Sequence, residues 1–166
     1  MDAKTVIELF NLKPLPFEGG YFRETYRSED RIEAGHLPGR YKTGRNICTA
    51  IYYLLTPDTV SKIHRLQSDE VFHFYLGDPV MMLLLYPDGR SDTVTLGSDI
   101  AIGHNIQLVV PRGVWQGARL CEGGRFALMG TTVAPGFKPD DFELAERREL
   151  LNKFTSHTDL IKMLTS

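Results

Sequence analysis

The fold prediction depends most on the stretch HRLQSDEVFHFYLG, residues 64–77. It contains two of the chain's five histidines, an acidic pair, and an almost continuous apolar and aromatic run that ends at a glycine. Alternate side chains of a β-strand share a face, so a tight turn at 67–69 would bring His64 and Glu70 into one interior from facing strands. An imidazole and a carboxylate placed in this way indicate a site inside a small β-barrel.

Short strands separated by turns continue on both sides of this stretch. About nine of them at this spacing indicate an antiparallel sandwich or barrel. We expect one helix before the strands, at 3–11, and two helices after them, at 139–154 and 158–164. The expected strands are runs rich in β-branched and aromatic residues at 21–27, 46–56, 59–65, 70–76, 80–86, 92–96, 107–110, 115–120 and 125–133.

The composition fits one cytoplasmic domain. The chain has 166 residues and a net charge of −2 with both signs mixed, so it offers no basic surface for nucleic acid or an anionic membrane. Cys48 and Cys121 are far apart and are expected to be buried reduced thiols. The N-terminal residues lack an apolar core and the longest apolar run, 80–85, is short, so we expect neither a signal peptide nor a membrane span.

Two motifs of the chain resemble those of the cupin superfamily. The first cupin motif is His, any residue, His, three residues, Glu, six residues, Gly. His64, Glu70 and Gly77 match it, and Leu66 stands where the second histidine belongs. The second motif is a Pro-x-Gly turn with a histidine three residues after the glycine. Here the turn is at 111–113, and Gln116 takes the place of the histidine.

Over about residues 10–150 the chain resembles one family within this superfamily, DUF985 or Cupin_5. The resemblance implies an all-β fold, the jelly-roll β-sandwich or cupin barrel, with short N-terminal and C-terminal helices. It implies a single cupin domain, 1–166, with its core at about 17–135, and it implies no specific activity. The matching blocks are GGYFRETYRS (19–28), IYYLLT (51–56), SDEVFHFYLGDP (68–79), VPRGVWQGA (110–118) and VAPGFKPDDFELA (133–145).

The same resemblance implies a homodimer, because jelly-roll cupins of this type commonly dimerise. The aromatic strands at 19–27 and 51–55 and the open edges of a sandwich would provide the surface for pairing. We therefore expect a homodimer that binds a small-molecule ligand and neither nucleic acid nor membrane.

His64 and Glu70 are the expected catalytic residues. Burying an ionisable group in an apolar barrel costs on the order of several kcal/mol unless it has a partner, which favours a functional role over a structural hydrogen bond in the core. Gln116 follows the turn that delivers a side chain into the pocket, and its amide is expected to bind substrate. Phe72 and Phe74 share the face of Glu70 and are expected to contact substrate as well.

His73, Arg23 and Tyr21 complete the expected substrate-binding residues. Strict alternation turns His73 away from the face of Glu70, so it reaches the interior only if a β-bulge re-aims it. Arg23 would hold a carboxylate or phosphate at the barrel mouth, or else form an exposed ion pair with a neighbouring glutamate. Arg23 and Tyr21 share one face of their strand, and the pattern does not decide which face is inside. Phe137 is expected to close one barrel end.

The resemblance implies a cupin metal site of three histidines and one glutamate, but Leu66 and Gln116 occupy two of its four positions. We therefore expect no metal and no cofactor. The expected function is small-molecule binding, with metal-independent, isomerase-like or epimerase-like chemistry on a sugar or other small polar substrate. In that chemistry His64 and Glu70 would move a proton next to a carbonyl group. The alternatives are a non-catalytic ligand-binding module and a metal-dependent cupin enzyme.

Overall fold

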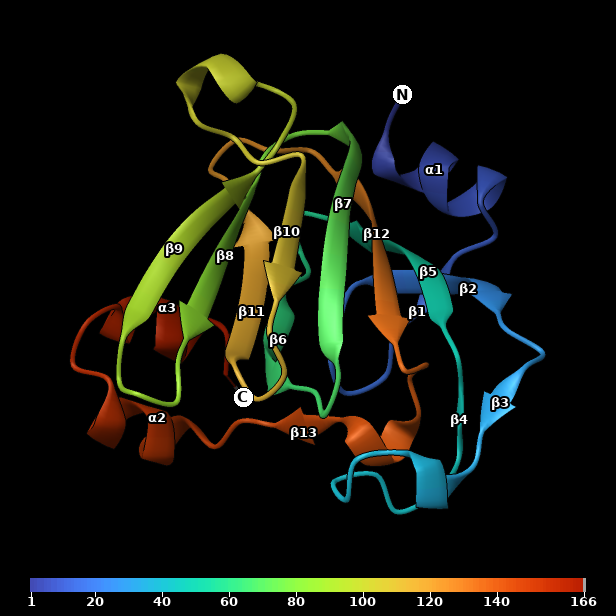
Figure 1. Cartoon of the computed structure of the whole chain (residues 1–166). Helices are drawn as coiled ribbons and strands as arrows, with labels where there is room; N and C mark the ends of the chain where they lie inside the picture. Colours follow the sequence, from blue (N-terminus) through green and yellow to red (C-terminus); the bar gives the residue numbers. More distant parts are fainter. Residues whose placement is uncertain (166) are drawn as a thin grey trace.

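Two antiparallel β-sheets pack face to face in the structure, a computed structural model that describes residues 1–165 (Figure 1). The first sheet has six strands in the order β1-β2-β5-β12-β7-β10 and the second has five in the order β13-β6-β11-β8-β9. The expected all-β sandwich with short terminal helices is confirmed. The strands of the first sheet are β1 Lys13–Pro14, β2 Tyr21–Arg27, β5 Thr49–Leu55, β12 Ala127–Ala134, β7 Asp69–Gly77 and β10 Gln107–Val110; those of the second are β13 Glu143–Leu144, β6 Ser61–Arg65, β11 Trp115–Leu120, β8 Val80–Leu85 and β9 Ser91–Leu96. A separate pair is β3 Arg31–Ile32 and β4 Arg45–Asn46, and three single turns of 3-10 helix are η1 Ala34–His36, η2 Ile100–Ile102 and η3 Pro139–Asp141.

The main core lies between the two sheets, and strand β8 shows why a continuous apolar run was needed there. Val80, Met82 and Leu84 face the six-stranded sheet and pack into the main core. Leu83 and Leu85 face the other way and pack against the C-terminal helices. Because both faces of β8 are covered, an alternating pattern would have placed polar side chains in an apolar environment.

Short helices cover the outer faces of both sheets (Figure 1). Helix α1, Ala3–Leu9, packs on the six-stranded sheet through Val6, and its first turn is capped by Asp2, whose Oδ1 accepts a hydrogen bond from the Thr5 amide at 2.8 Å. Helices α2, Arg147–Lys153, and α3, Thr158–Met163, cover the five-stranded sheet. The helices expected at 3–11 and 158–164 are confirmed.

The helix expected over 139–154 is wrong in its first half. Only residues 147–153 are α-helical; before them the chain forms η3 and then the two-residue strand β13. Glu143 and Leu144 pair with Arg65 and His64 of β6 and so add a strand to the five-stranded sheet. Helix propensity is weaker than this tertiary hydrogen bonding, which turns a helix-like sequence into an extended one.

A buried ion pair fixes the segment that precedes β13. Arg45 on β4 donates from Nε to Asp141 Oδ2 at 3.1 Å and from Nη2 to Asp141 Oδ1 at 2.5 Å, and both side chains are almost fully buried. Asp141 belongs to residues 137–142, which we call the cover segment. The ion pair therefore ties the cover segment to strand β4.

Three other expectations concern surfaces. Cys48 and Cys121 are free thiols, but each is only partly buried. In residues 1–165 no helix has the length and hydropathy needed to cross a bilayer.

The homodimer stays a prediction. The outer face of the six-stranded sheet carries an aromatic pair, Tyr52 and Tyr75, which is suitable surface for such an interface.

Breaking the buried ion pair should destabilise the fold strongly. We expect Arg45→Met to lower the free energy of unfolding by about 3–5 kcal/mol, because it leaves the Asp141 carboxylate buried without its cation. Adding Asp141→Leu should restore much of that loss. Urea unfolding monitored by circular dichroism measures both, and Glu143→Gln, which removes an exposed pair with Arg65, is the control, with an expected cost below about 1 kcal/mol. Equal costs for the buried and the exposed pair would contradict this prediction.

Candidate active site

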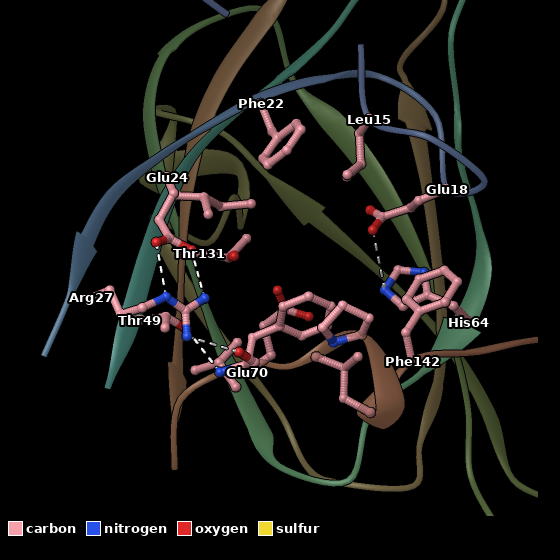
Figure 2. Close-up of a pocket in the computed structure, with 15 residues that line it drawn as sticks. Leu15, Glu18, Phe22, Glu24, Arg27, Thr49, His64, Glu70, Thr131 and Phe142 are labelled. Carbon is pink, nitrogen blue, oxygen red and sulfur yellow. Dashed lines mark hydrogen bonds and ion pairs between the residues drawn. The ribbon is translucent and has the colours of Figure 1, made fainter. Parts of the chain in front are cut away.

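A cavity of about 280 Å³ lies between the inner face of the six-stranded sheet, strand β6 and the cover segment (Figure 2). One part of its wall is apolar, and the other carries ionisable groups that point inward. The apolar lining residues are Leu15, Phe22, Ile51, Leu66, Val133, Phe137, Pro139 and Phe142, and the polar ones are Glu18, Glu24, Arg27, Thr49, His64, Glu70 and Thr131. Phe137, expected at a barrel end, lines the cavity from the cover segment.

The His64 ring is fixed in a single orientation on β6. Its Nδ1 lies 2.7 Å from the backbone carbonyl oxygen of Lys62, and because a carbonyl only accepts, the ring hydrogen is assigned to Nδ1. One ring face stacks on Phe142, with the centroids 4.9 Å apart and the planes at 24°. In the neutral ring, Nε2 then carries the lone pair and can act as a base. The His64 residue is only 3% exposed.

Glu70, on β7, reaches the same space from the opposite sheet. Its Oε2 accepts a hydrogen bond from the Gln116 amide nitrogen at 2.6 Å, and that nitrogen also lies 3.5 Å from His64 Nε2. These contacts bring His64, Glu70 and Gln116 together, with Gln116 between the two ionisable groups. His64 and Glu70 line the cavity, whereas Gln116, expected to bind substrate, is not among its lining residues. Burial raises the pKa of Glu70, and the nearby His64 together with hydrogen bonds from Thr131 and Gln116 opposes part of that rise.

Glu18 is an ionisable residue of the cavity that the sequence reasoning missed. Its Oε1 accepts a hydrogen bond from Ser61 Oγ at 2.9 Å, and its Oε2 lies 3.9 Å from His64 Nε2. Figure 2 shows the two side chains pointing toward each other across the cavity. The missed signal is the Glu18-Gly19-Gly20 sequence, because two glycines with positive φ, 105° and 71°, let the loop turn inward.

Glu24 and Arg27 form an ion pair at the cavity wall (Figure 2). Arg27 Nε and Nη2 donate to the two Glu24 carboxylate oxygens at 2.9 and 2.7 Å. Its Nη1 donates to Asn46 Oδ1 and to the Phe137 carbonyl oxygen at 3.1 and 3.2 Å. The register of β2 shifts between Glu24 and Tyr26, and this irregularity brings Arg27 to the inner face in place of Tyr26. Alternation alone could not have found this pair.

The structure shows which face of β2 points into the sandwich, a question that the sequence pattern did not decide. Phe22 and Glu24 line the cavity, whereas Arg23 and Tyr21 point to the outer face of the sheet. The Arg23 guanidinium lies over the Tyr52 ring at 5.4 Å from its centroid, and Tyr21 packs in the cluster beneath α1. The structure therefore does not bring these two expected binding residues to the cavity.

His73 also lies on the outer face of the six-stranded sheet. Its Nδ1 is 3.2 Å from Gln107 Nε2 and its Nε2 is 3.3 Å from Thr132 Oγ1, so neighbouring strands hold both ring nitrogens. The β7–β12 register does shift, but only opposite Leu128 and Met129, beyond His73 along β7. Strict alternation therefore holds between Glu70 and His73 and separates them.

Three aromatic residues of the inner face belong to the core rather than to the cavity wall. Phe72 and Phe74 pack among the apolar side chains between the sheets and do not line the cavity. Tyr53 is buried nearby and donates from its hydroxyl group to the Gly19 carbonyl oxygen at 3.0 Å. Burial, followed by the neighbouring Glu18 carboxylate, raises the pKa of Tyr53 well above its usual range.

The residues present do not fit a cupin metal centre. Leu66 lines the cavity with no ligand atom, and Gln116 uses its amide nitrogen on Glu70. Within residues 1–165 no three His, Cys, Asp or Glu side chains come together in a geometry that could hold a metal ion. The ionisable groups that remain are suited to moving protons and to electrostatic recognition.

The raised pKa of Glu70 should make stability depend on pH in a defined direction. The folded state keeps a proton on Glu70 that the unfolded chain releases near the ordinary pKa of 4.5. The contribution of this group is therefore fully present below that pH and is lost as the pH rises through the folded-state pKa. We expect wild type to lose stability relative to Glu70→Gln over that window, measured by urea unfolding between about pH 4 and 8. A stability difference that stays constant, or that changes in favour of wild type, would contradict this.

Known proteins resemble this chain in sequence along most of its length. The family described as "Cupin superfamily (DUF985)", Cupin_5, matches residues 4–145. The uncharacterized protein YML079W of Saccharomyces cerevisiae is 36% identical over 135 residues, and the match covers 76% of this chain and 65% of the yeast protein. The chain therefore spans 65% of the length of that relative.

Solved structures resemble it in fold. Protein SO0799 from Shewanella oneidensis has a TM-score of 0.86 at 34% identity and covers 100% of this chain and 98% of its own. A hypothetical protein from Leishmania major has a TM-score of 0.87 at 29% identity, with 99% of both chains covered. A mutant of Bacillus subtilis oxalate decarboxylase, at 15% identity and a TM-score of 0.53, covers 93% of this chain and 37% of its own, which supports the fold alone. The chain belongs to the Cupin_5 (DUF985) family of the cupin superfamily.

Proposed function

We propose that the cavity is a metal-independent acid–base site that moves a proton within a small polar molecule, in the manner of an isomerase or epimerase. The observation that carries this proposal is the tautomer of His64. Its Nδ1 hydrogen is directed at the Lys62 carbonyl group, so the lone pair is on Nε2, which lies 3.5 Å from the Gln116 amide nitrogen and 3.9 Å from the Glu18 carboxylate of the cavity wall. A base held in this way is ready to accept a proton from a bound substrate.

Glu70 supplies the acid. Burial favours the neutral form of its carboxyl group, so the proton is retained to a higher pH than in an exposed glutamate. In the proposed step, Nε2 takes a proton from the carbon next to a substrate carbonyl group. The electron pair of that C–H bond forms a carbon–carbon double bond, and the carbonyl oxygen receives the Glu70 proton. The His64 imidazolium then returns its proton to the former carbonyl carbon. At the same time the Glu70 carboxylate takes the proton of the hydroxyl group on the carbon that was first deprotonated, so a carbonyl group forms there. The carbonyl group has moved by one carbon, and both residues are back in their starting protonation states.

The closeness of the two groups favours a transfer between adjacent atoms. One amide nitrogen of Gln116 contacts both Glu70 Oε2 and His64 Nε2, so the acid and the base are close enough to act on neighbouring atoms of one small molecule. A 1,2-shift through an enediol-like intermediate needs this arrangement, since one face of the substrate both loses and regains the proton. A sugar or another small hydroxycarbonyl compound has the required groups.

The runner-up is a ligand-binding module without chemistry. Its support is the apolar share of the wall, because a mostly apolar pocket with a few convergent polar groups is the general form of a small-molecule site. The metal-dependent alternative has the least support, because the ligand positions at Leu66 and Gln116 do not provide histidines.

Proton exchange in D₂O tests the acid–base proposal. Small hydroxyaldehydes and hydroxyketones, sugars included, are incubated with the protein, and NMR follows the replacement of the proton next to the carbonyl group. We expect wild type to exchange it, and His64→Gln and Glu70→Gln to slow the exchange by roughly 10²–10⁴-fold, as for loss of a general base or acid.

His73→Gln is the matched control for this experiment. It removes a histidine from the outer face of the same sheet and should leave the exchange rate unchanged. Exchange that survives in both cavity variants, or that falls equally with His73→Gln, would contradict the proposal. Binding without exchange of any compound would support the ligand-binding module instead.

A further inference from the structure

We infer that the ligand of this cavity carries a protonated amine and that Glu18 is the residue that recognises it. The inference rests on the proposed function only in placing the ligand beside His64, and it adds the charge of that ligand. Four observations support it: the charges of the cavity wall, the spacing of Glu18 and His64, the backbone that holds Glu18, and the aromatic part of the wall.

The described cavity wall offers no unpaired lysine or arginine to an anionic ligand. Among the residues that line it in the described chain, Arg27 is the only lysine or arginine. Its guanidinium is already paired with both oxygens of Glu24. A phosphate or carboxylate group entering the cavity would therefore meet the Glu18 carboxylate with no unpaired lysine or arginine beside it. The phosphate or carboxylate recognition expected of Arg23 is also absent from the cavity, since Arg23 lies over Tyr52 on the outer face.

The space between Glu18 and His64 fits a donor group of the ligand. Glu18 Oε2 and His64 Nε2 are 3.9 Å apart, which is too long for a direct hydrogen bond. Both atoms accept hydrogen bonds while the imidazole is neutral. An ammonium group carries three donors, so it can reach the Glu18 carboxylate and the His64 lone pair together. The Glu18 side chain is 15% exposed, which leaves it accessible from the cavity.

The backbone holds the Glu18 carboxylate in place before any ligand binds. The backbone carbonyl oxygen of Glu18 accepts a hydrogen bond from the Lys62 amide at 2.9 Å. The two residues that follow Glu18, Gly19 and Gly20, adopt positive φ. A Cβ atom at Gly19 would clash with the Val60 carbonyl oxygen, so only glycine fits there. The preceding residue, Phe17, also has a positive φ of 67°, an uncommon conformation for a residue with a side chain. A recognition group that is preorganised in this way loses little entropy on binding.

The apolar wall suits the rest of such a ligand. Phe22, Phe137 and Phe142 line the cavity and offer aromatic surface to the carbon skeleton of an amine. Aromatic ring faces also attract an ammonium group, and the attraction strengthens where water is excluded. The site therefore combines one carboxylate, one neutral base and aromatic walls, which is a cation-selective combination.

Three probes with the same ring test the inference: cyclohexylammonium, cyclohexanol and cyclohexanecarboxylate. Binding to the full chain is measured near neutral pH by isothermal titration or NMR chemical-shift perturbation. We expect the ammonium probe to bind at least about tenfold more tightly than the alcohol and the carboxylate to bind most weakly, since one ionic contact in a partly dry site is worth about tenfold or more. Glu18→Gln should reduce ammonium binding by about tenfold and change alcohol binding by less than about twofold.

Glu149→Gln, on the exposed side of α2, is the matched control and should leave all three affinities unchanged. Glu18→Gln keeps the size and the Ser61 contact of the side chain, and thermal unfolding checks that it folds. The inference is overturned if the ammonium probe shows no binding, if it binds no better than the alcohol or the carboxylate, or if Glu18→Gln binds it as wild type does. Amine binding without proton exchange would retain this inference and reject the acid–base function. Turnover of an anionic substrate would do the reverse.

Discussion

The hydrogen bond between Gln116 and Glu70 is the contact on which the interior of this sandwich depends. Glu70 belongs to the six-stranded sheet and Gln116 to the five-stranded sheet, so their bond of 2.6 Å crosses the space between them. Both side chains are buried, at 7% and 2% exposure, and an unpaired polar group at such a place costs about 1–3 kcal/mol. The amide thus makes the buried carboxyl group tolerable and at the same time holds it next to His64. A complete cupin motif has histidine at this position; the glutamine uses its amide as an internal donor to the carboxyl group.

The fold could be predicted well from the sequence because its signals are local and repeated. Turn residues recur between short β-branched and aromatic runs, and a run without alternation, such as 80–85, indicates a strand covered on both faces. The prediction failed at 143–144, where the sequence favours a helix and pairing with β6 produces a strand. That pairing joins residues separated by almost half the chain, and no local pattern carries information about it. Long-range pairing decides such segments, whereas propensity contributes only a weak bias.

The candidate site could be predicted only where a motif fixed the register. His64, Glu70 and Gln116 follow from two short motifs whose spacing survives in three dimensions. Arg27 depends on a register shift inside β2, and Glu18 on a loop whose shape comes from positive φ angles. Such features alter the direction of a side chain without altering the hydrophobic pattern. Arg23 shows the opposite error, a residue predicted for the site that lies outside it. A guanidinium group is a good ligand for anions, but this property does not indicate which face of the strand is inside.

The segment at 142–144, whose structure was predicted wrongly, also completes the site. Strand β13 pairs with β6 at His64, and this pairing carries Phe142 onto the face of the imidazole ring. The Lys62 carbonyl group already holds the ring through Nδ1, so the ring is restrained both at its edge and across its face. A ring flip would put Cδ2 in the place of Nδ1 and Cε1 in the place of Nε2, so it would break the hydrogen bond to Lys62 and turn Nε2 away from its neighbours. The cavity therefore always meets the same nitrogen, and its reactivity is set by the groups around that atom: the Gln116 amide on one side and the Glu18 carboxylate on the other.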